Sequence, residues 1–201
     1  PHSVISGEGA MTKDLIQVAD VDFRNVNITS ILAVFVIILI SFCSLSIPVL
    51  LVGSIESAIF INMGIPYFTG IQLPFVASIV VGTIQLGATV DYAILTTTRF
   101  KEELQNGHTV KEAAHISVEQ CSQSILTSGL TFFAATASVA AISQMELISS
   151  LCELISRGAL ISMLVIILIL PALLIVFAPV IAHTTRRWPK VQKAASTGKE
   201  V

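Results

Sequence analysis

Charged residues are scarce in this sequence of 201 residues, where Asp, Glu, Lys and Arg together make up 12%. This is about half the share found in soluble domains. The formal net charge of −2 provides no basic field that would attract nucleic acid. Three scattered cysteines, Cys43, Cys121 and Cys152, exclude a disulfide-built secreted domain, and we interpret them as small buried hydrophobic residues. The four histidines lack metal-ligand spacing, so we expect no metal site.

Apolar residues are correspondingly abundant, at 54% of the sequence with a mean hydropathy of +0.86. Long runs without charge indicate membrane spans, each of which needs roughly 20 apolar residues. The pattern predicts an all-α membrane protein, a bundle of five transmembrane helices that crosses the plasma membrane several times. The expected spans are residues 28–45, 48–63, 74–99, 124–145 and 155–182, with breaks at Pro48 and at Gly64–Pro66 and with Pro171 inside the last span.

The segments outside the spans have their own patterns. We expect residues 1–27 to be the end of an extracytoplasmic domain and a connecting amphipathic helix. A capping-box pattern at Thr109–Glu112 predicts a helix over residues 109–121, either an amphipathic helix on the cytoplasmic membrane surface or a plain loop helix. Residues 183–201 form a basic tail. Because the sequence begins at Pro1 and no signal peptide opens it, we expect a part of a longer protein.

The distribution of Lys and Arg predicts the orientation in the membrane. Eight of the eleven basic residues follow the third or the fifth span, and three lie on the opposite side. This excess predicts that the N-terminus lies outside the cell and the C-terminus in the cytoplasm. An odd number of spans also requires the two ends to lie on opposite sides.

Asp91 is the most informative residue, because it lies within the third predicted span. An acidic side chain near the centre of a membrane helix costs about 2.5–3.5 kcal/mol and usually faces the interior of a bundle, on an ion or proton path. We therefore expect Asp91 to lie among packed helices, with a structural hydrogen bond as the alternative role. Tyr92 follows directly and can pass a hydrogen bond to a carboxylate on a neighbouring helix or to water.

Small residues surround this position. Gly87 lies one turn before Asp91, and residues including Ser124, Ser128 and Thr131 recur every three or four positions in the fourth span. Such spacing allows helices to approach closely. We expect this stripe to pack against the Asp91 helix and to offer it hydrogen bonds, or else to serve ordinary helix packing.

Two further positions carry charge inside predicted spans. Glu56 lies in the middle of the second span, where it is either a second titrating acid or a residue in a solvated groove. Glu153 and Arg157 have the i,i+4 spacing of an ion pair, which predicts a structural clamp at the start of the fifth helix.

The segment Gly87–Ala88–Thr89–Val90–Asp91–Tyr92–Ala93–Ile94, followed by Arg99–Phe100–Lys101–Glu102–Glu103, closely resembles a signature of the MMPL branch of the resistance-nodulation-division (RND) transporter superfamily. There a Gly-x-x-x-Asp-Tyr segment lies in the fourth helix of each six-helix half, and an Arg-x-x-Glu pair follows at its cytoplasmic end. The segments Gly7–Met11 and Leu170–Leu174 also match. The residues around Asp91 are similar to those in sequences of the Gram-positive branch of this family.

The resemblance implies spans 8–12 of a twelve-span transporter, in its C-terminal half. Asp91 and Tyr92 would then form a proton relay facing an equivalent pair in the N-terminal half, with Arg99 and Glu102 at the cytoplasmic end. The family couples proton entry to the export of lipids or other hydrophobic molecules. The implied coupling ion is the proton, no other cofactor is implied, and Glu56 matches no motif of the family.

Two other functions compete with this hypothesis. An intramembrane aspartyl protease needs two aspartates that share a proton, whereas only Asp91 lies within a predicted span. We therefore do not expect an enzyme. A lipid-sensing or scaffold bundle, related in fold to sterol-sensing domains, remains compatible with the sequence, because a fold does not determine a function.

Overall fold

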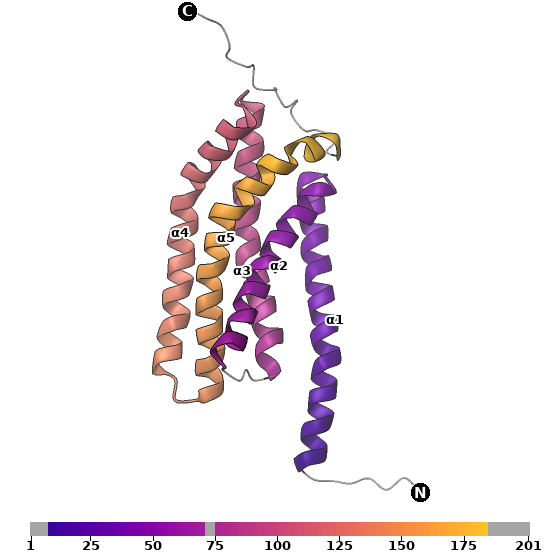
Figure 1. Ribbon diagram of the computed structural model, residues 1–201, viewed down its shortest axis with the longest axis vertical. Helices are drawn as coiled ribbons and strands as arrows, with labels where there is room; N and C mark the ends of the chain where they lie inside the picture. The colour runs from indigo at the N-terminus through magenta and orange to yellow at the C-terminus, as the bar shows by residue number, and fades with distance from the viewer. Residues whose placement is uncertain (1–7, 71–74, 185–201) are drawn as a thin grey trace, which may run out of the picture.

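The computed structural model describes residues 8–70 and 75–184, and helices are the only regular secondary structure within these residues (Figure 1). The five helices are α1 (Glu8–Phe42), α2 (Ser46–Thr69), α3 (Phe75–Gln105), α4 (Val110–Ile142) and α5 (Glu146–Thr184). Each contains a segment long and apolar enough to cross a membrane. The prediction of an all-α bundle with five spans is confirmed.

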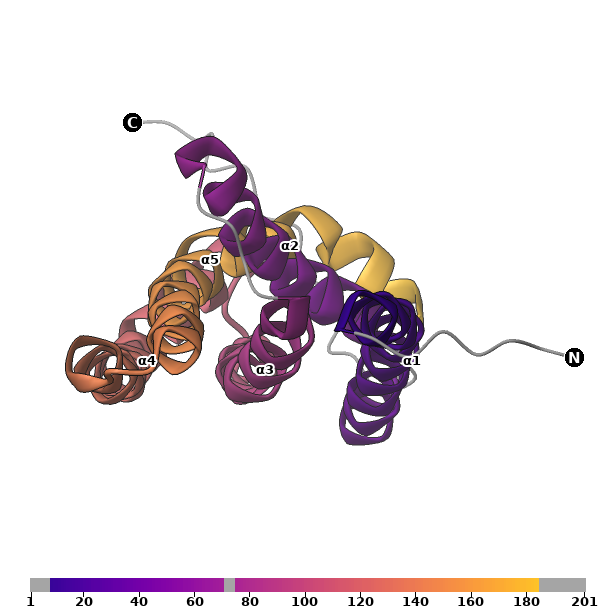
Figure 2. The same ribbon diagram turned by 90° about the horizontal axis from the view of Figure 1, so that it is seen from below.

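Consecutive helices run in alternating directions, so α1 begins and α5 finishes at opposite ends of the bundle (Figure 1). The backbone of α5 lies close to α2, α3 and α4, whereas the backbone of α1 lies close only to α2 and α3. The view along the bundle shows α1 and α4 at its two edges (Figure 2). In both edge helices, the most apolar window is only 11% buried. The two edge helices therefore expose long apolar surfaces.

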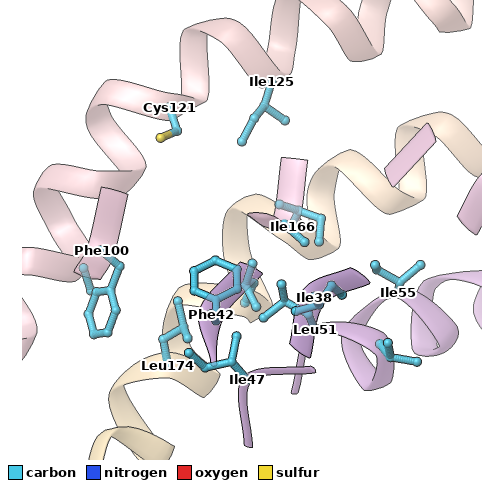
Figure 3. Close-up of a cluster of buried hydrophobic side chains, with 14 of the residues drawn as sticks. Ile38, Phe42, Ile47, Leu51, Ile55, Phe100, Cys121, Ile125, Ile166 and Leu174 are labelled. Atoms are coloured by element: carbon cyan, nitrogen blue, oxygen red, sulfur yellow. The ribbon is translucent and has the colours of Figure 1, made fainter. Parts of the chain in front are cut away.

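A large hydrophobic cluster with members from all five helices holds the bundle together (Figure 3). Ile38 and Phe42 at the end of α1 pack among residues of α2, α3 and α5 that are almost wholly buried. The labelled members are Ile38, Phe42, Ile47, Leu51, Ile55, Phe100, Cys121, Ile125, Ile166 and Leu174. A second, smaller cluster joins α3 to α5 through Ala77, Val81, Leu154 and Ile155. The core thus lies where α5 meets α2 and α3.

The helices are longer than the sequence predicts, and α2 shows one reason. We expected α2 to end at Met63 with a turn at Gly64–Pro66, but the helix continues to Thr69 with Pro66 inside it. Gly70, with φ of 69°, then ends the helix and donates its backbone N–H to the carbonyl of Pro66. Proline is tolerated in such helices because neighbouring groups can satisfy the freed carbonyl.

Helices α1 and α4 are each continuous where we expected two segments. The predicted helix over 109–121 and the span over 124–145 form one helix, Val110–Ile142. No glycine or proline lies between 110 and 128, and the buried face runs unbroken through Ala113, Ser117, Cys121 and Ile125. Likewise, the predicted connecting helix and the span over 28–45 are one helix, Glu8–Phe42, because neither a glycine nor a proline interrupts residues 10–42.

The predicted ends of the remaining helices are corrected in the same direction. The span over 74–99 is the helix Phe75–Gln105, and the span over 155–182 is the helix Glu146–Thr184, with Pro171 inside as predicted. Gly107, with φ of 94°, lies just after α3. The predicted capping box is confirmed: Thr109 and Glu112 exchange hydrogen bonds at the start of α4. Polar helix ends extend beyond the apolar runs because caps, rather than hydrophobicity, determine where a helix stops.

Candidate functional site

Asp91 lies on an exposed face of α3. Ile84, Gly87 and Leu95, which share this face at helical spacing, are exposed as well. Asp91 makes no hydrogen bond or ion pair with another described residue. The expectation that the helices of this chain enclose Asp91 is therefore not met: its carboxyl group lies on the outside of the five-helix bundle. Sequence periodicity shows which residues share a face, but not which face is covered.

Tyr92 points differently, because consecutive residues of an α-helix are about 100° apart. Its side chain is half-buried and lines a small cavity between α3, α4 and α5. This cavity has space for about one water molecule. Its other lining residues are Gln85, Ala88, Thr89, Gly129, Phe132, Ala159 and Ser162. Asp91 and Tyr92 therefore face two different environments, one outside the bundle and one inside it.

A cluster of buried amide side chains is formed by Asn62 on α2 and Gln85 on α3, which lies two turns before Tyr92. Asn62 Nδ2 donates to Gln85 Oε1 over 3.0 Å and to the carbonyl of Leu154 over 3.0 Å, and Gln85 Nε2 donates to Ser162 Oγ over 2.8 Å. Asn62 is 0% and Gln85 2% exposed. Every bond joins different helices, so this amide cluster fixes α2, α3 and α5 relative to one another. The sequence analysis did not identify Asn62, whose polarity within an apolar run was the available signal.

Arg157 belongs to the edge of the amide cluster. Its Nε donates to Asn62 Oδ1 over 3.2 Å, while no ion pair joins it to Glu153 among the described residues. The predicted Glu153–Arg157 clamp is thus wrong. Asn62 is buried and competes successfully for the guanidinium group, whereas Glu153 is exposed, and an exposed ion pair contributes little.

The small residues of α4 also differ from the expectation. Ser124, Ser128 and Thr131 are exposed, and the Thr131 hydroxyl donates to the carbonyl of Thr127 in its own helix over 2.7 Å. The closest approach of α4 is instead toward α5, where a Cβ atom on Gly129 would lie 2.9 Å from Met163 Sδ. A Cβ atom on Gly87 would meet no atom within 4 Å. Gly87, Ser128 and Thr131 therefore lie on free surface rather than in contacts around Asp91.

Arg99 and Glu102 form the predicted pair near the end of α3. Arg99 Nη1 lies 2.7 Å from Glu102 Oε2, and Arg99 Nε lies 3.8 Å from Glu103 Oε1. Arg99 Nε also donates to Gln120 Oε1 on α4. The arginine consequently ties the end of α3 to the beginning of α4. A pocket lined by both polar and apolar groups opens beside this connection, with a volume of about 340 Å³.

Glu56 is half-buried on α2, and its atom Oε1 is buried without a hydrogen-bond partner. A buried acceptor without a partner costs about 1–3 kcal/mol. The three cysteines are free thiols, and only Cys121 is buried, so the prediction that all three are buried is correct for that residue alone. No cluster of His, Cys, Asp and Glu in the described part of the chain has the arrangement of a metal site.

Five apolar helices, an acid on one free face and a buried amide cluster together define a helical membrane protein that crosses the bilayer several times. Residues 3–197 match the sequence model of the MMPL family. The chain belongs to this family, as the sequence around Asp91 indicated.

Two curated relatives agree with this assignment. The chain is 30% identical over 174 residues to the "Putative membrane protein SCO6666" of Streptomyces coelicolor, a match that covers 85% of this chain and 24% of the relative. It is also 30% identical over 135 residues to the "Putative membrane protein YdgH" of Bacillus subtilis, covering 62% of this chain and 15% of the relative. The chain thus matches a quarter or less of the length of either relative.

Proposed function

We propose that this chain is the C-terminal membrane half of a proton-driven exporter of lipids or other hydrophobic molecules, with Asp91 as the group that gains and loses the proton. The proposed function is transport rather than catalysis. The observation that carries the proposal is the place of Asp91: an acid within an apolar span, on a free face of the bundle, inside the segment that resembles the Asp-Tyr signature of the family.

The exposed face of α3 that carries Asp91 also indicates that another protein surface covers this site. A carboxyl group exposed to hydrocarbon is costly, so it needs a covering surface. In this proposal, the covering surface is the N-terminal half of the same transporter. The small residues Gly87, Ser128 and Thr131 are exposed on α3 and α4 and permit close contact with another helix. Because the chain matches less than a quarter of SCO6666, a second half has room in a protein of that length.

In this proposal the end of α3 and the end of α5 lie in the cytoplasm, an orientation supported by the excess of basic residues after these helices. Protons then travel from the outer side to Asp91 and onward to the cytoplasm. Tyr92, inside the bundle, supplies a hydroxyl group to the cavity next to Gln85 and Ser162.

The test compares surface lipids of the native host. The gene for the full-length protein is deleted and then restored as wild type, as Asp91→Asn or as Asp22→Asn, a control acid that is exposed on α1. We expect at least one extractable surface lipid to disappear on deletion, to return with wild type and with Asp22→Asn, and to stay at least tenfold reduced with Asp91→Asn at equal protein level. Restoration by Asp91→Asn, or a deletion that alters no surface lipid, overturns the proposal.

A second measurement separates the exporter from a lipid-sensing bundle. We expect a protonophore to stop export of the affected lipid in wild-type cells within the time needed to collapse the proton gradient. Export that continues unchanged after the collapse contradicts proton coupling.

A further inference from the structure

The pocket between α3 and α4 lies on the same side of α3 as Asp91. Leu95, Thr98 and Glu102 line it and follow Asp91 at intervals of four, three and four residues, which places all four side chains along one face. With a rise of about 1.5 Å per residue, Thr98 is roughly 10 Å from Asp91 along the helix. The pocket thus begins about one turn beyond the acid and extends toward the end of α3.

Five of the seven residues that line this pocket are polar, although apolar atoms make up the larger part of the exposed lining. Besides the α3 residues it includes Arg99 and, from α4, Gln120, Cys121 and Ser124. At about 340 Å³, the pocket has room for several water molecules, and its hydroxyl, amide and ionised groups are able to bind them. The bond from Arg99 to Gln120 connects the two helices at this pocket. A hydrated space within a membrane helix pair is favourable only with such a lining.

Leu95 is the one large aliphatic residue of the lining, and it is the nearest to Asp91. Its side chain is 43% exposed and lies one turn beyond the acid on the shared face. It therefore separates the pocket from the carboxyl group. An apolar side chain at this place interrupts a continuous file of water.

We propose that this pocket is an aqueous vestibule through which Asp91 exchanges protons with the solvent at the end of α3, and that Leu95 is the apolar barrier between vestibule and acid. The inference deepens the proposed function and rests on it for the role of Asp91. In the release step, the Leu95 side chain moves aside and a vestibule water reaches the acid. The carboxylic acid gives its proton to this water, which yields a carboxylate and a hydronium ion. The ionisable groups of the pocket lining are Arg99 and Glu102 from α3 and Cys121 from α4.

The first test measures water access and needs no transport. In the full-length protein with Cys43, Cys121 and Cys152 replaced by alanine, Thr98→Cys or Ser124→Cys is exposed to a membrane-impermeant methanethiosulfonate. The matched control is Leu164→Cys, because Leu164 is 52% exposed on α5 inside an uncharged run and in our proposal faces lipid. We expect both vestibule cysteines to react at least tenfold faster than the control, and only from the cytoplasmic side.

Equal reaction rates at Thr98→Cys and Leu164→Cys overturn the vestibule, as does labelling of Thr98→Cys from the outer side alone. Because the reagent reports on water rather than on export, this failure leaves the exporter proposal standing. Conversely, normal export by Asp91→Asn leaves the labelling result intact.

The second test concerns Leu95. In liposomes that contain the full-length protein and an internal pH-sensitive dye, we expect Leu95→Ala to raise passive proton entry severalfold over wild type and over Leu164→Ala. The added leak disappears in the double variant Leu95→Ala/Asp91→Asn if the protons pass through Asp91. A leak equal to that of wild type, or one that persists without Asp91, contradicts the role assigned to Leu95.

Discussion

Asn62 on α2 donates a hydrogen bond to Gln85 on α3 over 3.0 Å, and both side chains are buried in an otherwise apolar bundle. In hydrocarbon, an amide without partners costs several kcal/mol. The two amides satisfy each other, and Leu154 and Ser162 on α5 accept their remaining bonds. This arrangement specifies one register for three helices, because sliding any of them by a turn would break several bonds together.

Gly158 makes this register possible, and its replacement is expected to weaken it. A Cβ atom at Gly158 would lie 2.5 Å from Gln85 Oε1 and 2.6 Å from Asn62 Nδ2. We expect Gly158→Ala to destabilise the bundle by about 1–3 kcal/mol, since overpacking forces side chains and backbone to shift. The measurement is the apparent melting temperature of the full-length protein in detergent, read by the loss of monodisperse protein.

Gly82→Ala provides the matched control for this substitution. Gly82 also lies inside a membrane helix, but a Cβ atom there meets no atom within 4 Å. Alanine is the better helix former by about 1 kcal/mol, so this variant should melt at the wild-type temperature or above it. Equal melting temperatures for the two alanine variants would show that the amide cluster tolerates the added methyl group.

Glu56 is expected to reduce stability in the native protein. Its Oε1 is buried without a hydrogen-bond partner in the middle of α2. We expect Glu56→Leu to raise the melting temperature, because the change removes a charge and an unsatisfied acceptor from an apolar span. Glu119→Leu, at an exposed position of α4, should leave the melting temperature nearly unchanged. A lower melting temperature for Glu56→Leu would reveal a stabilising partner for this carboxylate.

The capping box at the start of α4 allows a local test. Thr109 Oγ1 accepts from the Glu112 N–H over 3.4 Å, and Glu112 Oε2 accepts from the Thr109 N–H over 3.0 Å. Loss of an N-cap side chain costs about 0.5–2 kcal/mol. We expect Thr109→Ala to speed amide hydrogen exchange over the first turn of α4 by roughly two- to thirtyfold.

Ser122→Ala serves as the control for the capping test, because the Ser122 hydroxyl only bonds back to the carbonyl of Glu119 within α4. This variant should leave exchange in the first turn of α4 unchanged. Unaltered exchange in Thr109→Ala as well would mean that contacts with α3, rather than the cap, hold this helix end.

The sequence predicted those features that depend on local chemistry. Uncharged runs predicted the five spans, and the capping box at Thr109 predicted the start of a helix. The predicted break at Pro66 was wrong. The carbonyl that proline leaves without its helical hydrogen bond can be satisfied by neighbouring groups in the folded bundle, which the local sequence does not reveal. The continuity of α4 was missed because a change in polarity at Gln120 does not interrupt backbone hydrogen bonds.

The candidate site was only partly predictable for a related reason. The motif identified Asp91 as unusual, but its exposure depends on which face of α3 the other four helices cover. The bond between Asn62 and Leu154 joins residues 92 positions apart, and no periodicity in either helix announces it. Composition and residue spacing describe one helix at a time. A polar cluster formed by three helices is predictable only when the packing of these helices is known.

Gln85 and Asp91 lie about 9 Å apart on one unbroken helix. A rotation of α3 large enough to reorient Asp91 would also turn Gln85 away from Asn62 and Ser162. The amide cluster therefore opposes any such rotation, because two buried amide side chains would lose their hydrogen-bond partners together.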